Sequence, residues 1–120
     1  MKEAKVSEKK ITKNEGYAAQ TQGNIWIQRN DFFQAAVDYT YAALCYCDSD
    51  EGANLMALVE GLAEDCLPKL TKKNLEEHNL KTNLDNLLGK LKRKNIDGYI
   101  TSPIKTFEKA LKETKNRENV

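Results

Sequence analysis

The sequence predicts an all-α protein of about five helices, joined by short loops into antiparallel helical hairpins. Apolar residues recur at spacings of three and four along several segments, as they do on the buried face of an α-helix. No stretch alternates apolar and polar residues with the two-residue period of a strand over more than a few residues. The chain has 120 residues, which fits one domain. We expect a single helical domain over residues 13–115, with a flexible segment at 1–12 and a flexible tail at 116–120.

The composition narrows the classes of function. The chain carries 19 Lys and Arg against 18 Asp and Glu, whereas a dedicated DNA-binding domain usually has a clear basic excess. No apolar run approaches the ~20 residues that span a bilayer, and the first ten residues lack the apolar centre of a secretory signal. The three cysteines are an odd number and do not form a disulfide framework. These features predict a cytoplasmic protein that does not engage a membrane.

The first two helices are expected to form a hairpin. The first begins near Asn14, because Tyr17 and Ala18 share a helical face with Ile25 and Trp26. Asn and Asp favour turns and caps, so Arg29-Asn30-Asp31 is a predicted break. The next segment, from about Phe32 to Cys47, is the most apolar of the chain and should be its central helix.

Three further helices are expected. The third runs from about Glu51 to Leu67, with Asp50 as its cap and Pro68 either ending it or beginning a new turn. Thr71 is the expected cap of a fourth helix that continues through Lys94. Residues 95–99 form a loop, after which Ser102 as N-cap and Pro103 at the first helical position start the last helix.

The predicted core is the set of apolar residues on the inner faces of these helices. Its members are Trp26, Phe32, Ala35, Tyr39, Ala42, Leu55, Val59, Leu62, Leu84, Leu87, Leu91, Phe107 and Leu111.

The predicted hairpin carries small and aromatic residues at a particular spacing. The pattern consists of Gly23, then Trp26, then the turn Asn30-Asp31-Phe32, then Ala35, Tyr39 and Ala42. Small residues let two helix backbones approach, and the aromatic rings fill the space beside them. Over about residues 16–49 this pattern resembles a tetratricopeptide repeat. Cys47 departs from the family, which often has proline there.

Repeats of this family recur with a period of 34 residues. Two periods after Tyr39 and Ala42 lie Phe107 and Ala110, so residues 95–115 resemble a degraded half-repeat. In the middle unit the expected aromatic falls on Lys73. Two interpretations stay open: a tetratricopeptide-like repeat module, or an unrelated compact helical bundle with the same packing.

The resemblance implies a non-catalytic protein-interaction module that binds a peptide or a partner protein. The family's binding face is the groove lined by the first helices of its hairpins. On this chain the matching candidates for partner binding are Asn24, Ile27, Gln28, Asn54 and Ala57. An adaptor, a chaperone or an immunity-type protein would all work this way, and self-association is left open.

A basic cluster supplies the alternative function. Lys90, Lys92, Arg93 and Lys94 could contact nucleic acid in a small helical accessory protein. The competing interpretation is that cations at the end of a helix complement its dipole.

No residues predict catalysis, and we expect neither a cofactor nor a metal. Cys45 and Cys47 are two apart, so on a helix their side chains point in nearly opposite directions and would not share a zinc ion. His78 is the single histidine and lies among polar residues, which predicts a solvated helix face. The expected state of the thiols is buried or half-buried.

Overall fold

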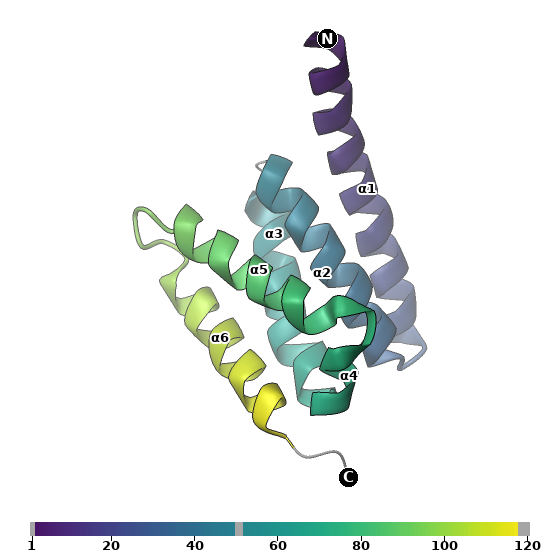
Figure 1. Ribbon diagram of the computed structural model, residues 1–120, viewed down its shortest axis with the longest axis vertical. Helices are drawn as coiled ribbons and strands as arrows, with labels where there is room; N and C mark the ends of the chain where they lie inside the picture. The colour runs from purple at the N-terminus through teal and green to yellow at the C-terminus, as the bar shows by residue number, and fades with distance from the viewer. Residues whose placement is uncertain (1, 50–51, 118–120) are drawn as a thin grey trace.

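A long first helix and an apolar second helix form the antiparallel hairpin on which the rest of the chain packs (Figure 1). A computed structural model describes residues 2–49 and 52–117, with side chains from Asn14 onward. Helix α1 spans Lys2–Gln28 and α2 spans Phe32–Ser49. Between them Asn30 takes a left-handed conformation with φ 62°, and Asp31 Oδ1 accepts a hydrogen bond from the Gln34 amide at 3.1 Å. The predicted break is confirmed.

The first helix is longer than expected. Its backbone is helical from Lys2 rather than from about Asn14, in a segment rich in the helix formers Lys, Glu and Ala. The predicted flexibility of residues 1–12 and 116–120 stays a prediction. Met1 and residues 118–120 lie outside the described part of the chain.

Helix α2 is the central helix, as predicted. It packs against α1, against α3 (Gly52–Gly61) and against α5 (Leu80–Lys94). Half of its residues are buried: Ala35, Ala36, Tyr39, Thr40, Ala42, Ala43, Cys45, Tyr46 and Cys47. Small side chains dominate this list, which lets neighbouring helices approach α2 from several sides.

The third helix ends earlier than expected, and the predicted cap Asp50 lies outside the described residues. After Gly61 the chain forms a π-helical turn, η1 (Leu62–Cys66), and a 3-10 turn, η2 (Leu67–Lys69). Pro68 has no amide hydrogen and its ring crowds the preceding turn, so a regular helix cannot continue to it. The carbonyl of Leu67 accepts hydrogen bonds from the Leu70 amide at 3.1 Å, from Thr114 Oγ1 at 3.0 Å and from the guanidinium of Arg117 at 2.9 Å.

The predicted fourth helix is two helices. Helix α4 (Lys72–Glu76) begins with the predicted cap: the Asn74 amide donates to Thr71 Oγ1, and the Thr71 amide donates to Asn74 Oδ1. The 3-10 turn η3 (Glu77–Asn79) then separates α4 from α5. A continuous helix is therefore wrong.

Burial explains this break. Leu75 and Leu80 are five residues apart, so on one straight helix they would point roughly 140° away from each other. Both are nearly inaccessible, at 2% and 1% exposed. The break at His78 and Asn79, which both have φ 55°, turns the two leucines into the same core.

The last helix, α6 (Thr101–Asn116), packs beside α5 and η1. The prediction of Ser102 as its N-cap is wrong, because Ser102 and Pro103 lie within its first turn. The side chain of Asn95 instead fixes the segment that leads into α6. Its Oδ1 accepts the Ile100 amide at 3.1 Å, and its Nδ2 donates to Thr101 Oγ1 at 2.8 Å.

The predicted core is confirmed except for two aromatic residues. Trp26 and Phe32 are half-buried, and the other eleven predicted residues are buried. Both exceptions carry a polar or charged neighbour: Trp26 Nε1 donates to Asp38 Oδ2 at 2.9 Å, and the Lys69 ammonium lies 5.8 Å from the centre of the Phe32 ring.

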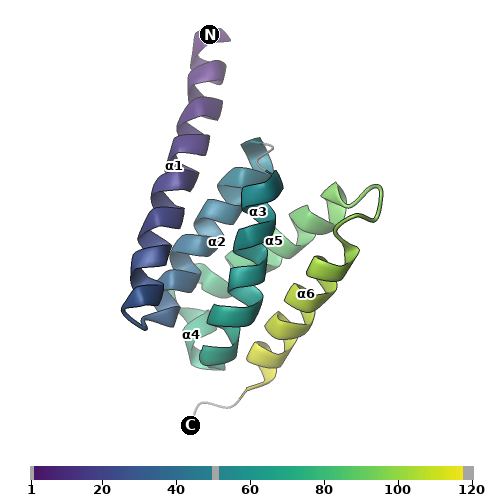
Figure 2. The ribbon, with the colours of Figure 1, turned by 180° about the vertical axis from the view of Figure 1, so that it is seen from behind.

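In outline, the described residues form an all-helical fold with five helices of ten or more residues and the short α4. The α1–α3 helices alternate in direction, and α1 and α6 lie on opposite sides of the bundle in both views (Figures 1 and 2). Within the described residues, no helix combines the length and the apolar character needed to cross a bilayer.

Candidate interaction surfaces

The ring of Tyr39 lies between α1 and α3. A Cβ atom built on Gly23 of α1 would lie 2.4 Å from Cδ1 and Cε1 of this ring, closer than any real side chain could sit. On the opposite edge of the ring, a Cβ atom on Gly61 of α3 would lie 3.6 Å from Cε2. The aromatic ring therefore contacts the α1 backbone directly and separates α1 from α3.

The hydroxyl group of Tyr39 reaches the surface of this junction. It donates a hydrogen bond of 2.5 Å to Oδ1 of the exposed Asn24. Burial raises the pKa of Tyr39, and the negative charges that Cys66 and Asp65 carry when ionised raise it further. The amide of Asn24 is thus held in one orientation by a neutral phenol.

The five predicted partner-binding residues lie on the two helices that flank Tyr39. Asn24, Gln28 and Ala57 are exposed, whereas Ile27 and Asn54 are half-buried. Helices α1 and α3 run in the same direction (Figure 2), and the Tyr39 ring contacts them at Gly23 and Gly61. Ile27 and Gln28 follow Gly23 along α1. Asn54 and Ala57 precede Gly61 along α3. The two sets are offset along the helices by roughly 12–18 Å. They share a side of α2 without forming one tight cluster.

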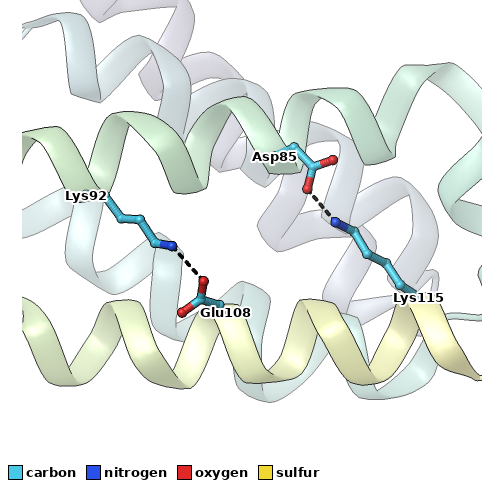
Figure 3. Close-up of polar contacts among 4 residues, drawn as sticks. All are labelled: Asp85, Lys92, Glu108 and Lys115. Carbon is cyan, nitrogen blue, oxygen red and sulfur yellow. Dashed lines mark hydrogen bonds and ion pairs between the residues drawn. The ribbon is translucent and has the colours of Figure 1, made fainter.

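The basic cluster lies on α5, and two of its lysines pair with carboxylates on two different neighbouring helices. Lys90 Nζ lies 2.9 Å from Asp48 Oδ1 of α2, and Lys92 Nζ lies 2.6 Å from Glu108 Oε2 of α6 (Figure 3). The hydrogen bond from Lys92 lowers the pKa of Glu108, and the Lys92 charge adds to the effect. Arg93 and Lys94 are exposed. Since Lys90 and Lys92 point to different partners, the four cations do not present a single basic face.

A second ion pair joins α5 and α6, as the Lys92–Glu108 pair does. Lys115 Nζ of α6 lies 2.6 Å from Asp85 Oδ1 of α5 (Figure 3). Both α5–α6 pairs are accessible to solvent, so each contributes little to stability. Their effect is to fix the register of α6 against α5 and to neutralise cations that sequence alone leaves unpaired.

The cysteines are buried and keep their protons at neutral pH. Burial raises the pKa of Cys47 to about 11, in spite of the nearby Lys94 and Lys90. Burial also raises the pKa of Cys66 to about 12 and raises that of Cys45. A thiol with a raised pKa is a poor nucleophile and a poor metal ligand. In the part of the chain that the structure describes, no three His, Cys, Asp or Glu side chains gather as a metal site.

The single histidine is exposed, as predicted, but it does not lie on a regular helix. His78 takes a left-handed conformation in η3, with its ring centre 5.6 Å from that of Phe33. This contact between α2 and the α4–α5 break helps to fix the break.

The surface feature that the sequence did not single out is the loop between α5 and α6. Ile96 is 86% exposed and Tyr99 is 90% exposed. Turn-forming residues correctly predicted a loop here. The direction of its side chains was not predictable, because a loop has no periodicity that assigns them to a buried or an exposed face.

The described surface has shallow hollows, of which two are compared with ligand sites. One, of about 220 Å³, is lined by Glu60, Ala63, Glu64, Ser102, Pro103 and Thr106. The other, of about 70 Å³, lies among Lys72, Leu75, Glu76, Lys81 and Lys115. Both are smaller than the ~300–1,000 Å³ of typical small-molecule sites.

Comparison with known proteins adds no family. No protein-family model, no curated protein and no solved structure matches this chain. The functional argument therefore rests on the geometry described above.

Proposed function

We propose that this chain is a non-catalytic protein-interaction module, of the adaptor, chaperone or immunity type. It binds its partner through the helical face that α1 and α3 form on one side of α2. The observation that carries the proposal is the Tyr39 ring, which touches the α1 backbone at Gly23 and reaches α3 at Gly61.

The packing of the hairpin supports this proposal by its likeness to a tetratricopeptide repeat. Ala35 and Ala42, which flank Tyr39 by one turn on each side, have no exposed surface. In that family, tight packing of this kind places first helices next to one another, and together they line the surface that binds a peptide. Here α1 and α3 would take that role.

The exposed groups beside Tyr39 suit the recognition of a polypeptide. The amides of Asn24 and Gln28 are exposed and each provides both donors and an acceptor for a main chain. Ala57 is exposed and small, so a partner could approach the α3 backbone closely. We assign the partner contact to these three residues, with Ile27 and Asn54 as neighbours.

One substitution tests this face with a matched control. Ala57→Lys places a long cation on the proposed face, and Ala18→Lys makes the same change at an exposed alanine of α1. Ala18 lies two residues after Gly16, whose backbone faces Tyr46 of α2, and so about 200° around the helix from that contact. We expect Ala57→Lys to weaken binding at least tenfold and Ala18→Lys to leave it unchanged.

The binding assay is affinity capture from an extract of the source cells, with and without nuclease, at low and moderate salt. A protein that survives nuclease and salt identifies the partner, and its affinity for each variant is then measured by titration calorimetry. Equal loss of binding in both variants, or in neither, would remove the α1–α3 face from the proposal.

Nucleic-acid binding is the second candidate, and the exposed Arg93 favours it. The ion pairs of Lys90 and Lys92 count against it, because these two ammonium groups already have carboxylate partners. Recovery of nuclease-sensitive material that is lost as salt rises would promote this alternative over protein binding.

A further inference from the structure

We propose that Asp97, in the loop between α5 and α6, is a site of spontaneous isoaspartate formation. In this modification the backbone nitrogen of Gly98 attacks the side chain of Asp97, and the main chain then runs through the former side chain. The inference concerns the chemistry of one loop. It does not depend on the α1–α3 face, and each proposal can fail without the other.

The reaction needs only these two neighbouring residues and water. The nitrogen of Gly98 bonds to Cγ of Asp97, and the protonated carboxyl group loses its hydroxyl group, which leaves as water with the amide hydrogen. The five-membered succinimide ring that results then takes up one water molecule. Cleavage of the bond between the nitrogen and Cγ restores aspartate, whereas cleavage of the original peptide bond gives isoaspartate.

The attacking nitrogen of Gly98 is available. Within the described residues its amide donates no hydrogen bond, although the Gly98 carbonyl accepts one from the Thr101 amide at 3.3 Å. Gly98 is exposed, and glycine has no Cβ atom beside its nitrogen. Its φ of 77° is a conformation that glycine adopts without strain. The nitrogen is therefore neither held by a hydrogen bond nor shielded by a side chain.

The carboxyl group of Asp97 is equally unengaged. Asp97 is exposed, and within the part of the chain that the structure describes its side chain makes no hydrogen bond and no ion pair. An aspartate in a loop often accepts a hydrogen bond from an amide two residues further on. Here the side chain of Asn95 takes the polar groups of Ile100 and Thr101 instead. The Asp97 carboxyl group is thus free to approach the next nitrogen.

Aspartates inside helices lack this freedom. The amides that follow Asp38 and Asp85 belong to α2 and α5, and in an α-helix each amide donates to the carbonyl four residues earlier. Ring closure at either residue would break that hydrogen bond and the helical turn around it. The structure therefore favours the reaction at Asp97 over these helical aspartates.

The fold should tolerate the modification. Isoaspartate adds one carbon atom to the main chain and leaves a free carboxylate on Cα. The neighbouring Ile96 and Tyr99 are 86% and 90% exposed, so neither side chain has to leave the core when the loop lengthens. The free α-carboxylate is the group that an isoaspartyl methyltransferase esterifies with the methyl group of S-adenosylmethionine, which names the class of enzyme that would recognise the modified chain.

Ageing of the purified full chain at neutral pH and physiological temperature tests the proposal. Isoaspartate is counted by transfer of a radioactive methyl group from S-adenosylmethionine with an isoaspartyl methyltransferase, and is located by electron-transfer fragmentation of peptides. We expect it to form at Asp97 at least tenfold faster than at Asp38 or Asp85. Circular dichroism and melting temperature of the aged protein should match those of the fresh protein.

Three variants separate the geometry of the loop from its sequence. Asp97→Glu keeps the charge but would have to close a six-membered ring, and Gly98→Asn adds a Cβ atom with a residue that tolerates positive φ. We expect each to lower modification at residue 97 at least fivefold. Asn86→Gly is the matched control, because it places glycine after the exposed Asp85 within α5. Asp85 should stay unmodified there.

Three results would overturn the inference. The first is an Asp97 that ages no faster than the helical aspartates. The second is equal isoaspartate formation at Asp85 of Asn86→Gly and at Asp97, since the dipeptide alone would then determine the reaction. The third is an unchanged rate in Gly98→Asn, which would mean that access to the nitrogen of residue 98 does not limit ring closure.

Discussion

Two glycine–tyrosine contacts join α1 to α2 and recur with the same spacing on both helices. Gly16 faces the ring of Tyr46, and Gly23 faces the ring of Tyr39. Each tyrosine hydroxyl also donates to an amide of α1, Tyr46 to Gln20 at 2.6 Å and Tyr39 to Asn24 at 2.5 Å. A ring that is held at both its edge and its hydroxyl cannot move aside for a larger residue.

Glycine replacement at these contacts gives the first prediction. In Gly23→Ala the new methyl would meet the Tyr39 ring at 2.4 Å, and such overpacking costs about 1–3 kcal/mol. Gly89→Ala is the control, because its methyl meets only the flexible Arg93 side chain at 3.5 Å. Alanine is favoured over glycine in a helix by about 1 kcal/mol.

We therefore expect Gly23→Ala to lower the free energy of unfolding by about 1–2 kcal/mol and Gly89→Ala to raise it by about 0.5–1 kcal/mol. Urea denaturation of the three proteins measures both changes. A stabilised Gly23→Ala protein would contradict the contact between the Tyr39 ring and the α1 backbone.

The buried thiols predict a loss of stability at alkaline pH. Folding raises the pKa of Cys66 from 9.0 to about 12, so above pH 9 the unfolded chain loses this proton while the folded chain keeps it. This contribution is fully present below pH 9 and is lost as pH rises toward 12. The slope for one such group is about 1.4 kcal/mol per pH unit.

Urea midpoints at pH 8 and pH 10 test this prediction. We expect the wild type to lose more stability between the two pH values than Cys66→Ala, which lacks the titrating group. Equal losses in the two proteins would show that Cys66 keeps an ordinary pKa in the folded state.

At the scale of elements, the sequence predicts turns and caps that local hydrogen bonds form, whereas it does not predict a break that tertiary packing causes. The cap at Thr71 and the turn at Asn30-Asp31 were predictable, because these side chains bond to backbone amides only three residues away. The break at His78 was not, because its cause is the burial of both Leu75 and Leu80 against distant helices. Polar residues around His78 fit an exposed helix and an exposed break equally well.

The two candidate sites likewise differ in how far the sequence predicts them. Exposed Asn24, Gln28 and Ala57 were predictable from helical spacing, since positions on a helix repeat with a known period. The partners of Lys90 and Lys92 were not, because Asp48 and Glu108 lie on other helices. Pairing across the bundle is a tertiary property that no local pattern reports.

The α4–α5 break gives the prediction at this scale. Asn79 has φ 55° and no side-chain cap bond, and residues other than glycine and asparagine pay about 1–2 kcal/mol in that conformation. Asn79→Ala should therefore lower the free energy of unfolding by about 1 kcal/mol, and Asn79→Gly should leave it within about 0.5 kcal/mol. Guanidinium denaturation distinguishes them, and equal stabilities would mean that the left-handed turn is not retained.

Across the whole molecule, the elements are not equally supported. Helix α2 contacts α1, α3, η1 and α5, whereas α1 packs almost entirely on α2. The C-terminal half of the chain closes on itself, because α6 contacts α3, η1 and α5 and Arg117 bonds the carbonyls of Leu67 and Leu70. The first helix is thus the element with the fewest independent attachments.

Hydrogen exchange should reveal this difference. We expect the amides of α1 between Asn14 and Gln28 to exchange at least tenfold faster than the buried amides of α2 and α5, because local opening of α1 breaks one interface only. Exchange measured by mass spectrometry on peptides from each helix tests this. Uniform protection across the three helices would indicate that the chain opens as a single unit.

Because α1 is attached mainly through its interface with α2, its detachment matters most at high protein concentration. When α1 detaches, the surface of α2 that carries Ala35, Tyr39 and Tyr46 becomes an acceptor that fits the α1 helix of any neighbouring molecule equally well. Exchange of the first helix between two chains would recreate every Gly–Tyr contact without a new interface. Such an exchange would give a domain-swapped dimer, and high protein concentration would favour it because two chains must meet.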